Sequence, residues 1–154
     1  TEELRNLSSQ EFLKDLLFKI KEKQKILSKS FVYVPIFIKV SPDEELEALE
    51  EICKSILDHK IDGIIACNTT IIHNDKNGYG GLSGSPLRYK SNEKLSFIKK
   101  IVGDKTSIIA SGGVMSTSDY IEKIDAGADL VQIYTGFIFE GPKLIQDILI
   151  ADSS

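Results

Sequence analysis

The sequence predicts an α/β fold in which parallel strands alternate with helices, as in a β/α barrel. After a first amphipathic segment, a short apolar run followed by a longer stretch with helical spacing occurs four times. Such alternation is typical of parallel sheets with right-handed crossovers. Four strands cannot close a barrel, so the chain supplies either a small open sheet or about the last four βα units of a (β/α)8 TIM barrel. Because no strand precedes the first helix, we favour the half-barrel.

Composition and charge narrow the functional classes. A chain of 154 residues with 42% hydrophobic residues suits one globular domain. The net charge of −4, with basic residues spread along the predicted helices, argues against a nucleic-acid surface. No apolar run reaches the roughly 18 residues of a membrane span, so this segment itself is expected to be soluble. Cys53 and Cys67 lie in no CxxC motif or metal-ligand cluster, which predicts no metal site and suits a reducing compartment.

The first helix and the first strand lie within residues 1–40. One amphipathic helix is expected in residues 1–30, followed by a lysine-rich turn (residues 19–25), because apolar residues have helical spacing at Phe12, Leu13, Leu16, Leu17 and Ile20. Residues 35–40 form a short buried strand that ends near Lys39. A lysine there should have an anionic or carbonyl partner, unless its side chain reaches water at the rim.

The second helix and strand follow directly. Ser41, Pro42 and an acidic pair predict a helix start, with an apolar face at Leu46, Leu49, Ile52, Cys53 and Ile56. The strand at residues 61–67 runs into Asn68, Thr69 and Thr70. Three small polar side chains at a strand end suit hydrogen bonding to a planar polar ligand. The same residues also suit local turn chemistry, and their pattern does not decide between the two.

A long glycine-rich segment separates the second strand from the third helix. Residues 71–86 exceed an ordinary connection, which indicates a functional loop or lid, and residues 80–84 can bring backbone amides to a ligand. The third helix is expected to start at Ser91 and Glu93 and to stop at Gly103.

The stretch from Ser107 to Gly141 organises the predicted site. A strand at residues 107–110 ends in Ser111-Gly112-Gly113, where a backbone without Cβ atoms can approach a ligand. Ser116 and Asp119 form a capping-box pattern, and Gly127 ends that helix. The strand at residues 130–134 then brings Tyr134-Thr135-Gly136 to the same sheet edge. Glycine amides, a hydroxyl and a helix start together predict a phosphate cradle. A final helix opens at Gly141-Pro142.

Six sequence blocks, in this order and spacing, resemble the quinone-linked (class 2) dihydroorotate dehydrogenases. They are TEELRNLSS, VPIFIKVSPD, IDGIIACNTT, GGLSGSPL, ASGGV and AGADLVQIYTGFIFEGP. The resemblance covers residues 1 to about 150. It implies a (β/α)8 barrel that binds FMN at the C-terminal ends of its strands and oxidises dihydroorotate to orotate in pyrimidine biosynthesis, with a quinone as electron acceptor.

The resemblance also implies roles for individual residues. Lys39 is similar to the lysine beside the flavin N1/C2 edge, where a fixed cation stabilises negative charge on the reduced ring. Asn68 and Thr69 are similar to the pair that binds the pyrimidine substrate, which favours the ligand-binding interpretation of this strand end. The residues implied to contact FMN are Lys39, Cys67, Ser83, Gly84, Gly112, Gly113, Tyr134 and Thr135. Cys67 departs from the family, which usually has threonine there.

The catalytic serine of the family belongs to a Ser-Pro-Asn-Thr stretch, of which this chain resembles the part beginning at Thr1. We therefore expect residues 1–154 to be the C-terminal half of one FMN-binding barrel domain, inactive without its N-terminal half. That half would also carry the helices that dock on a membrane and admit quinone. The full-length protein would then be membrane-associated, at the cytoplasmic side of a bacterial inner membrane or at the mitochondrial inner membrane.

Two other interpretations stay open at the level of sequence. One is a phosphate-binding β/α-barrel lyase or isomerase in which Lys39 forms a Schiff base or acts as acid and base. The other is a chain without catalysis of its own, either an inactive barrel fragment or a self-sufficient open-sheet binding module.

Overall fold

The computed structural model describes residues 10–72 and 80–153, so the TEELRNLSS block and most of the predicted loop between residues 71 and 86 lie outside the description. Four parallel strands form one sheet in chain order. The strands are β1 (Phe37–Val40), β2 (Gly63–Ala66), β3 (Ser107–Ser111) and β4 (Leu130–Gln132). The helices are α2 (Gln10–Leu27), α3 (Leu46–Asp58), η2 (Ser85–Leu87), α4 (Arg88–Val102), α5 (Thr117–Asp125), α6 (Thr135–Glu140) and α7 (Pro142–Asp152).

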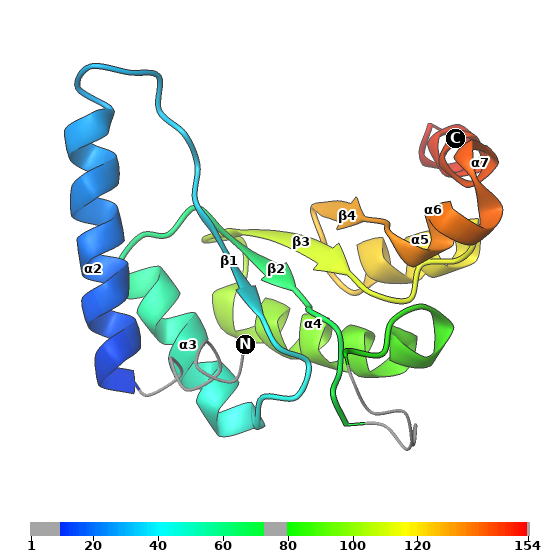
Figure 1. Cartoon of the computed structure of the whole chain (residues 1–154), viewed down its shortest axis with the longest axis horizontal. Helices are drawn as coiled ribbons and strands as arrows, with labels where there is room; N and C mark the ends of the chain where they lie inside the picture. Colours follow the sequence, from blue (N-terminus) through cyan, green and yellow to red (C-terminus); the bar gives the residue numbers. More distant parts are fainter. Residues whose placement is uncertain (1–9, 73–79, 154) are drawn as a thin grey trace.

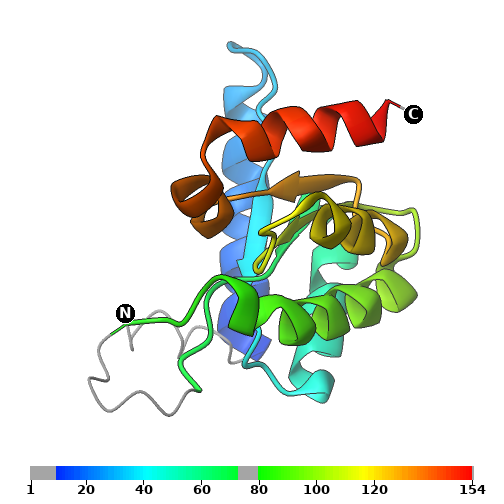
Figure 2. The same ribbon diagram turned by 90° about the vertical axis from the view of Figure 1, so that its right-hand side faces the viewer.

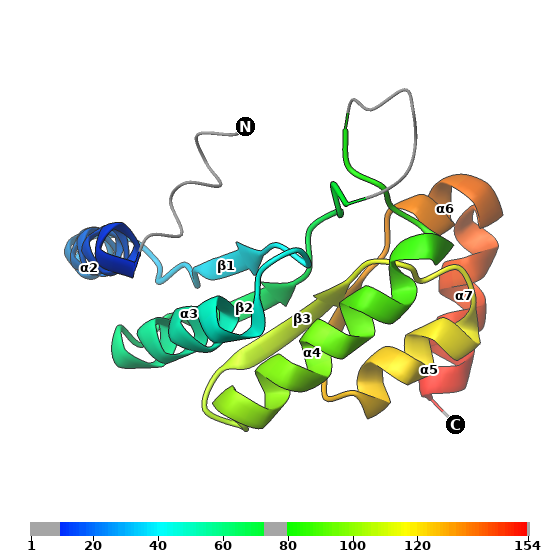
Figure 3. The same cartoon turned by 90° about the horizontal axis from the view of Figure 1, so that it is seen from below.

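The helices that follow the strands gather on one side of the sheet. Figures 1 and 3 show α3, α4 and α5 on the same side, with α2 at the β1 end and α7 at the β4 end. Figure 2 shows α5 between α4 and α7. The predicted alternation of helices with parallel strands is therefore confirmed.

The two faces of the sheet differ in burial. On the helical side the strands contribute buried apolar side chains that pack with α3 and α4, among them Val40, Ile64, Ala66, Ile108 and Ala110. On the other side, the pairing register sets Lys39, Ile65, Ile109 and Leu130 in one row across the sheet. None of these four is buried, and Leu130 is 63% exposed. One covered face and one open face are what a segment of a barrel wall presents, since a doubly wound sheet has helices on both faces.

The predicted lysine-rich turn at residues 19–25 is wrong, because α2 continues through it to Leu27. Lysine side chains facing solvent do not end a helix, and the inward face continues with Gln24, which is 7% exposed. The Gln24 amide Nε2 donates to the Val34 carbonyl at 2.8 Å and to the Asp62 carboxylate at 3.0 Å. These contacts join the end of α2 to the segments beside β1 and β2.

The predicted start of the second helix at Ser41 and Pro42 is also wrong, since α3 begins at Leu46. Ser41 Oγ instead accepts a hydrogen bond from the Asp43 amide at 3.1 Å, which closes a local turn. The Asp43 carboxylate accepts hydrogen bonds from residues distant in the chain, so it does not cap a helix.

Two further predicted boundaries are corrected. The third helix starts at Arg88 after the short helix η2, so Ser91, expected at its start, is buried inside it. The last strand ends at Gln132 instead of Tyr134, and α6 follows where no helix is expected.

Several local predictions are confirmed. Gly103 has φ 57° at the end of α4, and Gly141 with Pro142 opens α7. Ser116 caps α5, since its Oγ accepts from the Asp119 amide at 3.2 Å. Within residues 10–72 and 80–153, no helix is both long and apolar enough to cross a bilayer.

Candidate functional site

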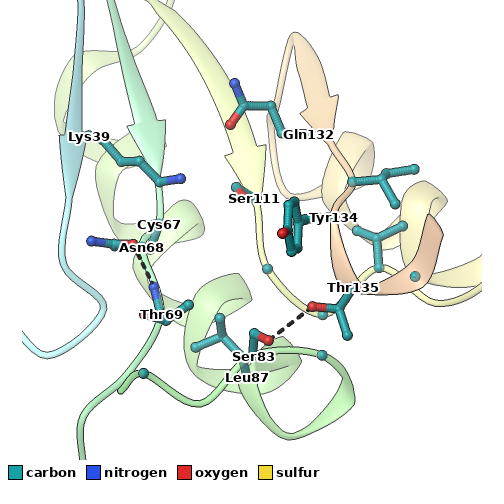
Figure 4. A pocket seen from close by; sticks show the side chains of 17 residues that line it. Lys39, Cys67, Asn68, Thr69, Ser83, Leu87, Ser111, Gln132, Tyr134 and Thr135 are labelled. Atoms are coloured by element: carbon teal, nitrogen blue, oxygen red, sulfur yellow. Dashed lines mark hydrogen bonds between the residues drawn. The ribbon is translucent and has the colours of Figure 1, made fainter. Parts of the chain in front are cut away.

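One pocket lies at the C-terminal ends of the four strands and has a volume of about 680 Å³. Every residue predicted to bind the cofactor or the substrate lines it: Lys39, Cys67, Asn68, Thr69, Ser83, Gly84, Gly112, Gly113, Tyr134 and Thr135. Figure 4 shows Lys39 and Asn68 on one side of the pocket and Tyr134 and Thr135 on the other. The strand tips of the sheet therefore converge on one cavity, whereas the binding role of each residue stays a prediction.

The first side of the pocket is built by β1 and the end of β2. Lys39 is exposed on the open face of the sheet, and no carboxylate of the described residues forms an ion pair with it. The Asn68 amide N–H donates to the Val40 carbonyl at 2.8 Å, which fixes the backbone beyond β2 to the tip of β1. The Asn68 side-chain oxygen accepts from the Thr69 amide at 3.0 Å. The side-chain NH2 of Asn68 and the ammonium of Lys39 are thus donors available to a polar ligand.

The second side is the glycine turn after β3. Gly112 and Gly113 have φ values of 113° and 80°, which residues other than glycine rarely adopt. A Cβ atom on Gly113 would come within 2.5 Å of the Arg88 Cα atom, so the turn packs directly on the start of α4. The first N–H groups of α6, from Thr135 onward, have no partner within that helix. The glycine turn after β3 and the start of α6, at two neighbouring strand ends, therefore line the same pocket.

A hydroxyl pair connects the glycine-rich loop to this second side. Ser83 Oγ and Thr135 Oγ1 lie 2.9 Å apart, within hydrogen-bond distance (Figure 4). Gly84, with φ 73°, packs against the Thr135 methyl group. The residues just before η2 are thus held against the start of α6, and both hydroxyls lie at the pocket wall.

Asp43 anchors the start of the segment that contains residues 73–79, and Thr70 joins this start to the segment's other end at Leu82. Its carboxylate accepts hydrogen bonds from the Ile71 amide at 2.8 Å, from Thr70 Oγ1 and from the Lys90 ammonium. Thr70 also exchanges backbone hydrogen bonds with Leu82, at 2.7 and 3.2 Å. Burial raises the pKa of Asp43, but the hydrogen bonds from Lys90, Thr70 and Ile71 outweigh it and hold that pKa below its usual value.

Cys67 places a buried thiol in the pocket wall, where it is 1% exposed. Burial raises the pKa of this thiol to about 12, against a smaller opposing effect of the lysines Lys123, Lys94 and Lys39. The thiol is therefore protonated at neutral pH and chemically quiet. Its backbone N–H donates to the Ser111 carbonyl at 2.9 Å, which ties the ends of β2 and β3 together.

Sequence reasoning missed several residues that line the pocket. They are Leu87, Val114, Gln132 and Ile133, whereas Gly81, Ser111 and Gly136 belong to stretches that were predicted to reach a ligand. Gln132 was detectable as a polar residue in an otherwise apolar strand, because strand periodicity sends it to the open face. Leu87 carries no such signal, since it reaches the pocket from η2, whose position depends on tertiary packing.

The pocket is chemically suited to a large ligand that is polar at both ends. Its volume falls within the range of roughly 300–1,000 Å³ typical of small-molecule sites. Amide and hydroxyl donors at the glycine turn and α6 suit a phosphate, while a cation and an amide at β1 and β2 suit a ring with carbonyl groups. These donors fit the two ends of FMN.

A protein-family model described as dihydroorotate dehydrogenase matches residues 1–151. The dihydroorotate dehydrogenase (quinone) of Aliivibrio salmonicida is 46% identical over 153 residues, which are 95% of this chain and 46% of that protein. The Haemophilus influenzae enzyme of the same name is 40% identical over 156 residues, with 97% and 46% covered. A crystal structure of the Eimeria tenella enzyme in complex with ferulenol matches with a TM-score of 0.85 at 28% identity, covering 94% of this chain and 44% of that one.

The chain thus spans about half the length of the curated relatives it matches, and it aligns with roughly their C-terminal half. The likeness confirms the predicted resemblance and the predicted part-barrel fold.

Proposed function

The chain belongs to the dihydroorotate dehydrogenase family, and from this premise we propose that it forms the C-terminal half of the FMN-binding barrel of a quinone-linked member. The complete protein would oxidise dihydroorotate to orotate in pyrimidine biosynthesis and pass the electrons to a quinone. The observation that carries the proposal is the convergence of ten residues, assigned from sequence to cofactor and substrate, on one pocket.

FMN would be held at both ends of this pocket. The glycine turn at Gly112 and Gly113, with the start of α6 and Thr135, would bind the phosphate through backbone and hydroxyl donors. When bound, FMN supplies the two-electron acceptor that oxidation of dihydroorotate requires. Lys39 would place a fixed positive charge beside the ring, where negative charge develops during the reaction. Asn68 and Thr69 would orient the substrate through hydrogen bonds.

The other half of the barrel is the partner that this sheet requires. The outer edges of β1 and β4 have no neighbouring strand among the described residues, and on the open face Ile65 and Ile109 are half-buried and Leu130 is exposed. A barrel interior is filled by layers of such side chains from all its strands. The proton-abstracting base, the rest of the substrate site and the membrane attachment would come from that half.

Expression of the full-length protein tests the proposal. We expect a yellow protein with flavin absorbance bands and with quinone reduction that depends on dihydroorotate. A colourless, inactive full-length protein would refute the function. Borohydride treatment in the presence of carbonyl compounds should leave Lys39 unmodified, because the lyase or isomerase alternative alone requires a Schiff base there.

A further inference from the structure

A second lysine, Lys123, lies buried behind the pocket, and no carboxylate among the described residues forms an ion pair with it. Lys123, near the end of α5, is 0% exposed, and its ammonium donates to Ser91 Oγ on α4. The carboxylates of Asp119 and Glu122 lie on the same helix, but both pair with the Arg88 guanidinium. Within the described part of the chain, no carboxylate forms an ion pair with Lys123. A buried ammonium without an anionic partner is costly, so packing alone does not explain its presence.

The contacts of Ser91 lead from this lysine to the glycine turn. Ser91 is also 0% exposed, and its Oγ donates to the Ser111 carbonyl at 2.9 Å. A Cβ atom on Gly112 would lie only 3.3 Å from Ser91 Oγ, so the hydroxyl packs directly beneath the turn. The positive charge of Lys123 is therefore separated from the proposed phosphate site by one hydroxyl group and one strand of backbone.

The charged groups around Lys123 come from three elements. Burial lowers the pKa of Lys123 to about 8, and the Arg88 guanidinium on α4 acts in the same direction. The Cys67 thiol after β2 and the carboxylates of Glu122 and Asp119 on α5 oppose this shift. An anion bound at the glycine turn would favour the protonated lysine in the same way.

We propose that Lys123 is a positioning residue whose ammonium, held by Ser91, supplies positive charge behind the Ser111–Gly113 turn and selects a dianionic phosphate ligand there. The inference rests on the proposed function, because FMN is the ligand that brings the phosphate. In this arrangement the backbone amides contact the phosphate and the buried cation strengthens their field, since charges interact strongly across a region of low dielectric.

The test compares FMN with riboflavin, which has the same ring system but no phosphate. Dissociation constants for both are measured by flavin fluorescence on the flavin-free full-length protein and on its Lys123→Met variant. We expect Lys123→Met to weaken FMN binding about tenfold, because the variant lacks the positive charge behind the phosphate site. Riboflavin binding should stay the same, because riboflavin has no phosphate. The variant should melt no lower than the wild type without flavin, because a buried charge is replaced by an apolar side chain of similar size. Lys100→Met, which removes an exposed lysine on α4, should change neither constant.

The pH dependence gives an independent readout. The preference of the wild type for FMN over riboflavin should fall between about pH 7 and 9.5, as the lysine of the flavin-free protein loses its proton. Lys123→Met should show no such fall.

An unchanged preference in Lys123→Met, or a constant preference across this pH range in the wild type, overturns the inference and leaves the proposed function intact. If the variant fails to fold, the wild-type pH profile decides alone. A wild type that binds neither flavin overturns both proposals.

Discussion

At the scale of single residues, the site depends on the chemical character of a few side chains. Lys39 is exposed on the open sheet face and has no carboxylate partner among the described residues. Cys67, by contrast, is buried and its backbone is tied to Ser111. The charge of Lys39 is thus available to a ligand. The Cys67 side chain contributes mainly packing, although it lies in the pocket wall.

Lys39→Ala in the full-length protein should slow flavin reduction by dihydroorotate by about 100-fold or more, because it removes a charge placed where negative charge develops. FMN content should change little, since other residues would hold the phosphate. Anaerobic stopped-flow absorbance measures the reduction rate, with Lys143→Ala on the exposed face of α7 as the matched control. Reduction at the wild-type rate would contradict the role of Lys39.

The cysteines of this chain should resist thiol reagents in the folded protein. Burial raises the pKa of both Cys53 and Cys67 to about 12, so neither forms a reactive thiolate below about pH 9. Maleimide labelling followed by peptide mapping should modify both only after unfolding. Rapid labelling of Cys67 in the native protein would show that the pocket wall opens readily.

At the scale of elements, the pocket is positioned by contacts between segments that are far apart in the chain. Asp43, after β1, anchors Thr70 and Ile71 after β2 and also accepts from Lys90 on α4. The glycine-rich loop thereby starts and returns at a fixed place, through the Thr70–Leu82 backbone pair. Ser83, at the end of this loop, then reaches the start of α6.

Asp43→Asn should loosen this anchor and destabilise the protein by about 1–3 kcal/mol, because a charged acceptor of several hydrogen bonds is lost. Amide hydrogen exchange should speed up at Ile71 and Leu82, while Asp58→Asn, an exposed position on α3, serves as the control. Equal exchange in the two variants would exclude the anchoring role.

The same carboxylate predicts an acid-dependent change. The pKa of Asp43 is lower in the folded protein than in the unfolded chain, so its contribution to stability is present above the unfolded pKa. That contribution is lost as the pH falls through the folded pKa. Denaturation titrations should therefore show the difference in unfolding free energy between wild type and Asp43→Asn shrinking at acid pH. A difference that does not vary with pH would contradict this account.

At the scale of the whole molecule, we expect the open sheet face and the outer edges of β1 and β4, which pair with no strand among the described residues, to decide how the chain behaves. Leu130, Ile109 and Ile65 form an apolar row on the uncovered face. Further apolar side chains are exposed between α2 and β1, at Phe31, Val32 and Val34. Exposed apolar patches and unpaired strand edges favour association.

The 154-residue chain expressed alone should therefore self-associate and bind a hydrophobic dye, whereas coexpression with the preceding half of the barrel should yield a soluble complex that binds flavin. Size-exclusion chromatography with light scattering measures both states. A monomer that melts cooperatively without a partner would instead support the open-sheet binding module.

The sequence by itself determined the features that depend on neighbouring residues. Glycines at positive φ after β3, the Ser116 cap of α5, the stop at Gly103 and the start at Gly141-Pro142 are all visible in a few adjacent letters, because each is satisfied within one turn of the chain. The order of strands and helices followed from apolar periodicity. Local pattern therefore predicted the phosphate end of the candidate site, whereas the assignment of Asn68 and Thr69 to the other end depended on the family resemblance.

Only the tertiary structure decided the roles of side chains whose partners are distant. Asp43 forms part of a helix-start pattern, yet it binds residues 27, 28 and 47 positions away. Ser91 forms part of a second helix-start pattern, yet in the structure it links Lys123 to the glycine turn. A buried polar side chain forms hydrogen bonds with the polar groups that lie near it in the folded protein. Which groups these are depends on how the sheet brings remote segments together.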